Sequence, residues 1–177
     1  MRKILFILAM VVSLSASVAS AQQRCDSHHE DRSGYEHRDR HHRSPYFVSE
    51  TKVFFDGREI KGASASSILI LRDGYAKDTW SVYYCGAKVD GASSNSFKVL
   101  GFGYAKDTWN VYFDGKKING ASPESFKVLR DGYAKDTWNV YFDAVKIEVA
   151  SPDSFKLLRG GYAKDTWNTY YFGRKID

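Results

Sequence analysis

The heptapeptide GYAKDTW recurs in this chain and decides its fold. It occupies residues 74–80, 103–109, 132–138 and 161–167, so its tryptophans follow one another at intervals of 29 residues. A fixed period of this length indicates tandem units that pack on their neighbours. Moving the pattern back by one period places a more divergent first unit at Tyr46. Units are therefore expected to start near residues 46, 75, 104, 133 and 162, in an array that spans residues 46–177.

Within each unit the residue pattern is typical of β-strands. Residues 111–113 (Val-Tyr-Phe) are β-branched and aromatic, and the Asp-Gly pair at 114–115 separates them from residues 116–118. An Asp-Gly pair between two such runs is a strong β-hairpin signal. A second Asp-Gly pair, at 131–132, predicts another hairpin between residues 126–129 and 133–135.

A short capped turn is expected between the hairpins, at residues 121–125 (Ala-Ser-Pro-Glu-Ser). Ser122 is placed as an N-cap and Pro123 as a first helical residue, which predicts one helical or 3₁₀ turn. The sequence thus predicts an all-β fold of tandem 29-residue β-meander repeats with short capped turns, in an elongated or solenoid-like array.

Alternation along the strands predicts which side chains form the core. With a period of two, Trp109, Val111 and Phe113 share one face, and Asn110 and Tyr112 share the other. One unit has too little apolar surface to fold alone, so the first face is expected to pack between units. The predicted core residues are the four tryptophans Trp80, Trp109, Trp138 and Trp167.

The opposite face predicts a stripe of tyrosines with serine or asparagine beside them. Tyrosine combines apolar area with a hydrogen-bonding hydroxyl, which suits contact with sugars or peptides. The alternative is that these rings pack against another strand layer and complete the core. The predicted binding surface consists of Tyr83, Tyr112, Tyr141 and Tyr170.

The repeat also resembles a known family, in residues 104–107, 110–118 and 120–129. This stretch is similar to the DKNYY family of bacterial, often exported, repeat proteins, over about residues 46–177. The chain has Thr-Trp where the family pattern usually has Lys and Asn after the aspartate, and Phe113 where a second tyrosine is common. The resemblance implies the repeat fold and an exported address, and it implies no biochemical activity.

The first 21 residues have the layout of a signal peptide. Arg2 and Lys3 precede an apolar run from Ile4 to about Val18, and small residues follow at 19–21. This run is too short for a membrane span, and no later segment is long and apolar enough for one. We therefore expect a secreted or periplasmic protein with no membrane span after signal cleavage.

Residues 22–45 are predicted to be a disordered tail rich in histidine and arginine. Almost no apolar residue occurs there, so this segment cannot bury enough surface to fold alone. His28, His29, His41 and His42 are candidate ligands for a divalent metal, although they lack the fixed spacing of a zinc motif. The alternative is that the tail is a solvated linker that binds no metal. Apart from a divalent metal, no cofactor is expected.

The chain has two cysteines, Cys25 in the tail and Cys85 in the array. An oxidising compartment permits them to form a disulfide, which would attach the tail to the folded part. Two free thiols are the alternative.

The charge distribution argues against a nucleic-acid partner. The net charge of +5 includes Arg2 and Lys3, and lysine and arginine alternate with aspartate along the array instead of forming a basic patch. No enzymatic activity is predicted either. A Lys-Asp pair recurs at residues 77–78, 106–107, 135–136 and 164–165, which indicates a structural duty in turn capping. Catalysis needs one convergent group of side chains instead.

The predicted function is that of a non-enzymatic exported repeat protein, whose extended aromatic surface binds a partner in the cell envelope. That partner would be an envelope protein or a glycan polymer. The alternative is a metal-binding or stress-related envelope protein that acts through its histidine-rich tail.

Overall fold

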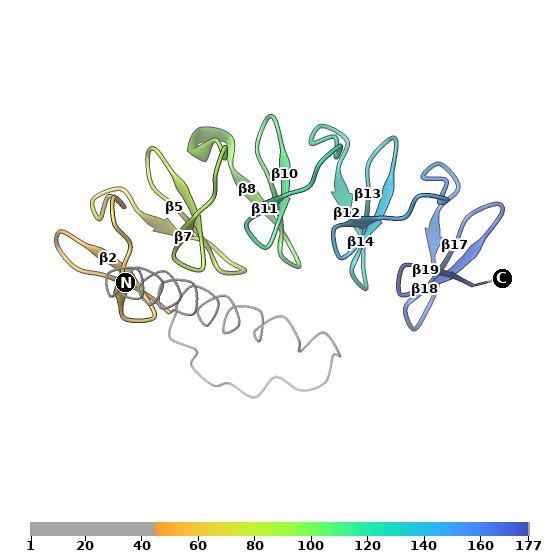
Figure 1. Ribbon diagram of the computed structural model, residues 1–177, viewed down its shortest axis with the longest axis horizontal. Helices are drawn as coiled ribbons and strands as arrows, with labels where there is room; N and C mark the ends of the chain where they lie inside the picture. The colour runs from red at the N-terminus through yellow and green to blue at the C-terminus, as the bar shows by residue number, and fades with distance from the viewer. Residues whose placement is uncertain (1–44, 177) are drawn as a thin grey trace, which may run out of the picture.

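The computed structural model describes residues 45–176, which form five small antiparallel β-sheets in a curved row (Figure 1). No α-helix occurs in this range, and η1 (Ser94–Ser96) is a single 3₁₀ turn. The predicted all-β fold of tandem meanders is therefore confirmed.

Each sheet is a meander in which consecutive strands pair antiparallel. The first sheet contains β1 (Tyr46–Val48), β2 (Val53–Phe55) and β3 (Arg58–Glu59). The second contains β4 (Leu69–Ile70), β5 (Tyr75–Lys77), β6 (Val82–Tyr84) and β7 (Ala87–Lys88). The third contains β8 (Lys98–Gly101), β9 (Tyr104–Lys106), β10 (Val111–Phe113) and β11 (Lys116–Lys117). The fourth contains β12 (Lys127–Val128), β13 (Tyr133–Lys135), β14 (Val140–Phe142) and β15 (Val145–Lys146). The fifth contains β16 (Lys156–Leu157), β17 (Tyr162–Lys164), β18 (Thr169–Tyr171) and β19 (Arg174–Ile176).

The tight turns have the conformation that their Asp-Gly pairs predict. Asp114 and Gly115 both have positive φ, at 48° and 74°, as a two-residue type I′ hairpin requires. Gly115 also lies against the preceding sheet, because a Cβ on it would stand 2.7 Å from Cβ of Tyr84. The turn glycine therefore serves both the hairpin and the close packing of successive sheets.

The capped turn between hairpins is only partly as predicted. Residues 123–125 form a hydrogen-bonded turn, and the equivalent segment of the preceding unit is η1. The side chain of Ser93, at the N-cap position of η1, makes no capping hydrogen bond. Instead, backbone N–H groups of these loops bind an aspartate of the next sheet, as described below.

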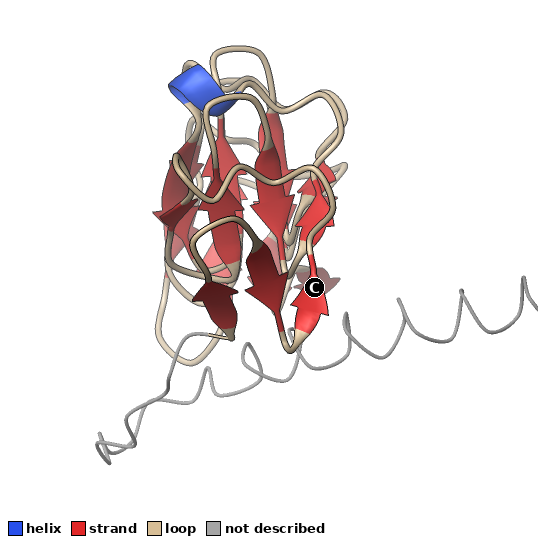
Figure 2. Ribbon diagram, turned by 90° about the vertical axis from the view of Figure 1, so that its left-hand side faces the viewer, coloured by secondary structure: helices blue, strands red, loops and turns tan. Residues whose placement is uncertain are grey.

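The core lies between the sheets, so that an inner sheet has two buried faces. Tyr104 and Val111 pack with Ala134 and Tyr141 of the following sheet. Their neighbours on the strands, Ala105 and Tyr112, face the preceding sheet. Figure 2, which looks along the row, shows the sheets one behind another.

Aromatic side chains from the linking segments fill the space between sheets. Phe126 lies between Tyr104 of the third sheet and Tyr141 of the fourth, with ring centroids 5.5 and 5.7 Å away. The Tyr104 hydroxyl also donates to the Gly132 carbonyl and accepts from the Ala144 N–H at 2.9 Å. Each sheet thus binds the next through both ring packing and a shared tyrosine hydroxyl.

Candidate binding surface

The four tryptophans lie on the surface, which corrects the prediction that they form the core. Their exposed fractions are 83%, 76%, 76% and 84% for Trp80, Trp109, Trp138 and Trp167, respectively. We call these four residues the tryptophan row. They occupy the turns after β5, β9, β13 and β17, along the upper rim of the array (Figure 1).

An aspartate holds each of these turns in a conformation that directs the indole outward. The carboxylate oxygen Oδ1 of Asp107 accepts hydrogen bonds from the backbone N–H groups of Trp109 and Asn110, both at 2.7 Å. The strand then begins at Val111, so Trp109 is a turn residue to which strand alternation does not apply. The same two bonds are formed by Asp78, Asp136 and Asp165 in the other units.

The second oxygen of each aspartate connects the turn to the core and to the preceding linker. Oδ2 of Asp107 accepts from the Tyr112 hydroxyl at 2.9 Å and from the Ser93 N–H at 2.8 Å. Asp107 is 4% exposed, so a buried carboxylate receives four hydrogen bonds. The prediction that these aspartates cap turns is confirmed, and the structure adds that each one also binds the turn to the preceding linker.

The tyrosines of the predicted binding surface are buried, which corrects that prediction. Tyr83, Tyr112, Tyr141 and Tyr170 are at most 2% exposed. Their rings pack on the preceding linker, as Tyr112 does on Phe97 at 5.7 Å between centroids. The physical reason is the stacking of sheets, since the face opposite Val111 is covered by the preceding sheet rather than by solvent. The alternative reading, in which these rings complete the core, is the correct one.

A comparison with protein families identifies the array. The model of the DKNYY family matches residues 75–177. The chain belongs to the DKNYY family. No curated protein and no solved structure matched the chain.

The rim of this DKNYY array has polar loops between the tryptophans. The Thr108 N–H donates to Oγ of Ser96 at 3.2 Å, which fastens the preceding loop to the tryptophan turn. An open cleft of about 540 Å³ lies beside this turn. It is lined by Ser96, Lys98, Lys106, Asp107, Thr108, Pro123 and Glu124.

The lysines of the repeated Lys-Asp pairs bind backbone carbonyls. Nζ of Lys106 donates to the Pro123 carbonyl at 2.7 Å, and Lys135 makes the same bond to Pro152. Lys77 donates to the Ser94 carbonyl at 2.9 Å. These ammonium groups secure the loops of the rim.

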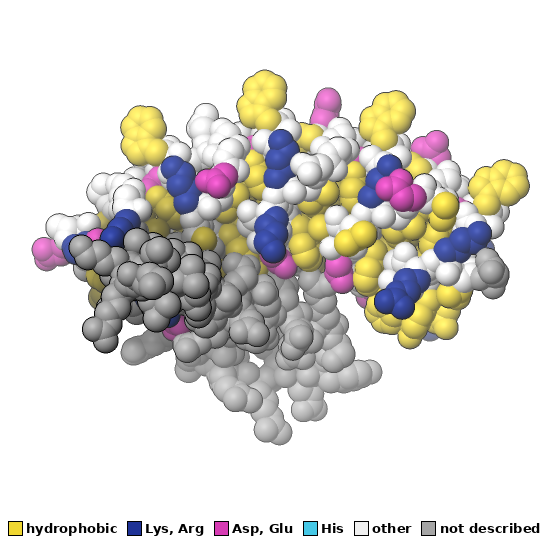
Figure 3. All heavy atoms as spheres, viewed as in Figure 1, with side chains coloured by type: hydrophobic (Ala, Val, Ile, Leu, Met, Phe, Trp, Pro, Cys, Tyr) yellow, Lys and Arg dark blue, Asp and Glu magenta, His cyan; other side chains and the backbone are white. Residues whose placement is uncertain are grey.

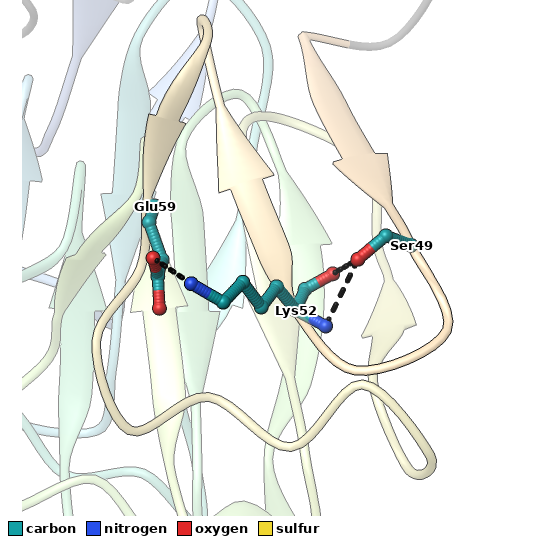
Figure 4. A network of polar contacts seen from close by, with 3 residues as sticks. All are labelled: Ser49, Lys52 and Glu59. Atoms are coloured by element: carbon teal, nitrogen blue, oxygen red, sulfur yellow. Dashed lines mark hydrogen bonds and ion pairs between the residues drawn. The ribbon is translucent and has the colours of Figure 1, made fainter.

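The first unit lacks both the aspartate and the tryptophan. Ser49 stands at the aspartate position, and its Oγ accepts from the Lys52 N–H and donates to the Lys52 carbonyl (Figure 4). Lys52 also forms an ion pair with Glu59 at 2.7 Å. Because Thr51 replaces the tryptophan, the tryptophan row starts at the second sheet.

The remaining predicted sites fall partly outside the described residues. His28, His29, His41, His42 and Cys25 all lie there, as do the signal peptide and almost all of the tail. Cys85 is buried and is not a free thiol, whereas the predicted pairing with Cys25 falls outside the described residues. Between residues 45 and 176 no group of three His, Cys, Asp or Glu side chains is placed to hold a metal. Within the same range no helix has the length and apolar character needed to cross a membrane.

The buried aspartates predict a loss of stability in acid. Burial alone would raise the pKa of Asp165, but hydrogen bonds from Ser151, Tyr170, Trp167 and Asn168 lower it to about 2. The pKa values of Asp78 and Asp107 are lowered by the same kinds of bond, against the effect of burial. An unfolded aspartate titrates near pH ~3.9, so this stabilisation is complete above that pH and is lost as the pH falls toward about 2.

We expect the free energy of unfolding, measured in urea, to fall as the pH is lowered from ~3.9 toward about 2. The Asp165→Asn variant should show a correspondingly shallower pH dependence. A free energy of unfolding that is equal at the two ends of the window would contradict the assignment of these bonds.

Proposed function

We propose that this DKNYY protein is a non-enzymatic, exported interaction module that binds its partner in the cell envelope through the tryptophan row. The observation that carries the proposal is the exposure of all four indole rings by the same aspartate-held turn in the second to fifth units. Exposed tryptophan is costly in water, and large exposed aromatic groups are enriched at the centre of binding surfaces. Four exposed tryptophans do not increase the solubility of the protein, so a role in binding explains them better.

The aspartates and lysines of the repeat support a binding role over a catalytic one. Their polar atoms are engaged by backbone groups that hold the turns and loops, as shown for Asp107 and Lys106. A catalytic carboxylate or amine must instead be directed at a substrate, in one convergent centre. The signal-peptide pattern at residues 1–21 supports the exported address.

The test is retention of the protein on envelope material from cells that express it. The double variant Trp109→Ser/Trp138→Ser should bind at least tenfold more weakly, because two of the four rings are lost. Its melting temperature should stay close to that of the parent, since both side chains are 76% exposed.

The matched control is Phe102→Asp. Phe102 is 52% exposed, has a φ of 55°, and lies in the β8–β9 turn, at the opposite end of β9 from the tryptophan turn. The second and fourth sheets carry Asp73 and Asp131 at this position, so the change removes an exposed ring and keeps the turn. Retention should be unchanged in this control. Equal retention of the double variant and the parent would overturn the proposed function.

A further inference from the structure

We infer that the tryptophan row binds a linear, uncharged glycan chain, with successive indole rings stacking on sugar rings along the polymer. The inference rests on the proposed function and adds the chemical class of the partner. It is carried by the repetition of one exposed ring on each of four consecutive sheets, by the polar loops between the rings and by the shape and charge of the rim.

The rings act as separate platforms. No aromatic pair within residues 45–176 includes a tryptophan, whereas the buried tyrosines and phenylalanines pair extensively. One ring projects from each of four consecutive sheets. Such a row fits a ligand that presents flat apolar faces at regular intervals, as a polysaccharide does. Figure 3 shows hydrophobic side chains projecting singly from the upper rim.

Polar side chains occupy the loops between the platforms. The exposed residues at the equivalent loop position are Asn95, Glu124 and Asp153. Serine hydroxyls lie beside them, of which Ser96 lines the cleft next to the Trp109 turn. A sugar ring has an apolar C–H face and a rim of hydroxyl groups, so it needs an aromatic surface with hydrogen-bonding groups at its edge.

The rim is a poorer match for a lipid bilayer. The row of sheets is curved with the tryptophan turns on its outer side, so a flat surface cannot meet the end turns and the central turns equally (Figure 1). Glu124 and Asp153 between the rings would also repel anionic headgroups, and the loop-securing ammonium of Lys106 is bound to a carbonyl. A chain-like ligand can follow the curve.

The mixture of acidic and basic side chains along the rim disfavours a polyanion. Single-stranded nucleic acid binds to stacked aromatic rings only where a positively charged groove follows its backbone. Beside the Trp109 turn, Glu124 lines the same cleft as Lys98 and Lys106, so charges of both signs occur there and no continuous positive groove follows the row. The glycan is therefore uncharged at physiological pH.

The test uses intrinsic fluorescence, because the chain has four tryptophans and all four belong to the row. The full-length protein is titrated with chitin and cellulose oligosaccharides of increasing length and, separately, with anionic phospholipid vesicles. We expect a blue shift of the emission with at least one glycan series, because stacking removes the indoles from water. Apparent affinity should rise by about a hundredfold or more from the shortest oligosaccharide to one that spans the row.

The variants separate this inference from the proposed function. In Trp138→Ser, most of the increase in apparent affinity with oligosaccharide length should be lost, while the affinity for the shortest oligosaccharide stays nearly unchanged. In Phe102→Asp, both the affinity for the shortest oligosaccharide and its increase with length should equal those of the parent. A shift with vesicles and none with the glycans overturns the inference in favour of a bilayer contact. No shift with either, while envelope retention still depends on Trp109 and Trp138, overturns it in favour of a protein partner. In both cases the proposed function stands.

Discussion

Replacement of Tyr112 by alanine is expected to lower the free energy of unfolding by about 4 kcal/mol. The side chain is fully buried, and its ring packs on Phe97 with centroids 5.7 Å apart. Its hydroxyl donates to Asp107 at 2.9 Å and approaches the Gly91 carbonyl at 3.1 Å. The substitution therefore leaves a cavity between two sheets and removes a hydrogen bond from a buried carboxylate. Urea unfolding measures the loss.

Two further variants test the origin of this loss of stability, one at Tyr112 itself and one at the exposed Trp109. Tyr112→Phe keeps the ring and loses the hydroxyl, so it should cost about 1 to 2 kcal/mol. Trp109→Ala removes a larger ring from the surface and should cost less than about 0.5 kcal/mol. If Trp109→Ala destabilised the protein more than Tyr112→Ala, the indole would lie in the core and the binding surface would have to be sought elsewhere.

The second large effect is expected for Asp107→Ala, at about 3 kcal/mol. Asp107 accepts hydrogen bonds from the N–H groups of Ser93, Trp109 and Asn110, and from the Tyr112 hydroxyl. The alanine variant leaves all four donors without their acceptor in a region that is shielded from water. Because Ser93 belongs to the preceding linker, the contact between two sheets weakens together with the turn.

Asp107→Asn and Glu124→Gln provide the controls for this experiment. The asparagine side chain keeps one carbonyl oxygen in place, so it should cost less than alanine and should reduce the loss of stability in acid. Glu124 is exposed on the rim, and its neutralisation should change stability by less than about 0.5 kcal/mol. A cost below about 1 kcal/mol for Asp107→Ala would show that the turn holds without its carboxylate.

Binding and stability are connected at the tryptophan turns. The backbone of Trp109 is held by Asp107, and Asp107 is held by the buried Tyr112 hydroxyl and by the Ser93 N–H of the preceding linker. The indole is thus fixed at its backbone while its ring stays in solvent. A ligand that stacks on such a ring does not have to order the loop that carries it, which lowers the entropic cost of binding.

The repeat, the strands and the turns could be predicted from the sequence because their causes are local. Each of these signals can be seen within one repeat of the sequence. They are the 29-residue interval between tryptophans, the β-branched and aromatic residues 111–113 and the Asp-Gly pair at 114–115. The structure places hairpins and sheets where these signals predict them. Turn capping by Asp107 belongs to the same class, since a carboxylate two residues before an N–H group can reach it in most environments.

The two faces of the strand were decided by the tertiary structure alone. Alternation assigns Trp109 with Val111 to a core face only if the strand includes both residues and one face meets solvent. Neither condition holds, because β10 begins only at Val111, after the turn that Asp107 caps, and stacked sheets cover both Val111 and Tyr112. The Asp-Thr-Trp-Asn sequence is a local signal for that turn and could have placed the indole outside. The burial of Tyr112 had no such signal, since it depends on the preceding sheet and on Phe97 of the linker, which contact Tyr112 only because the sheets stack.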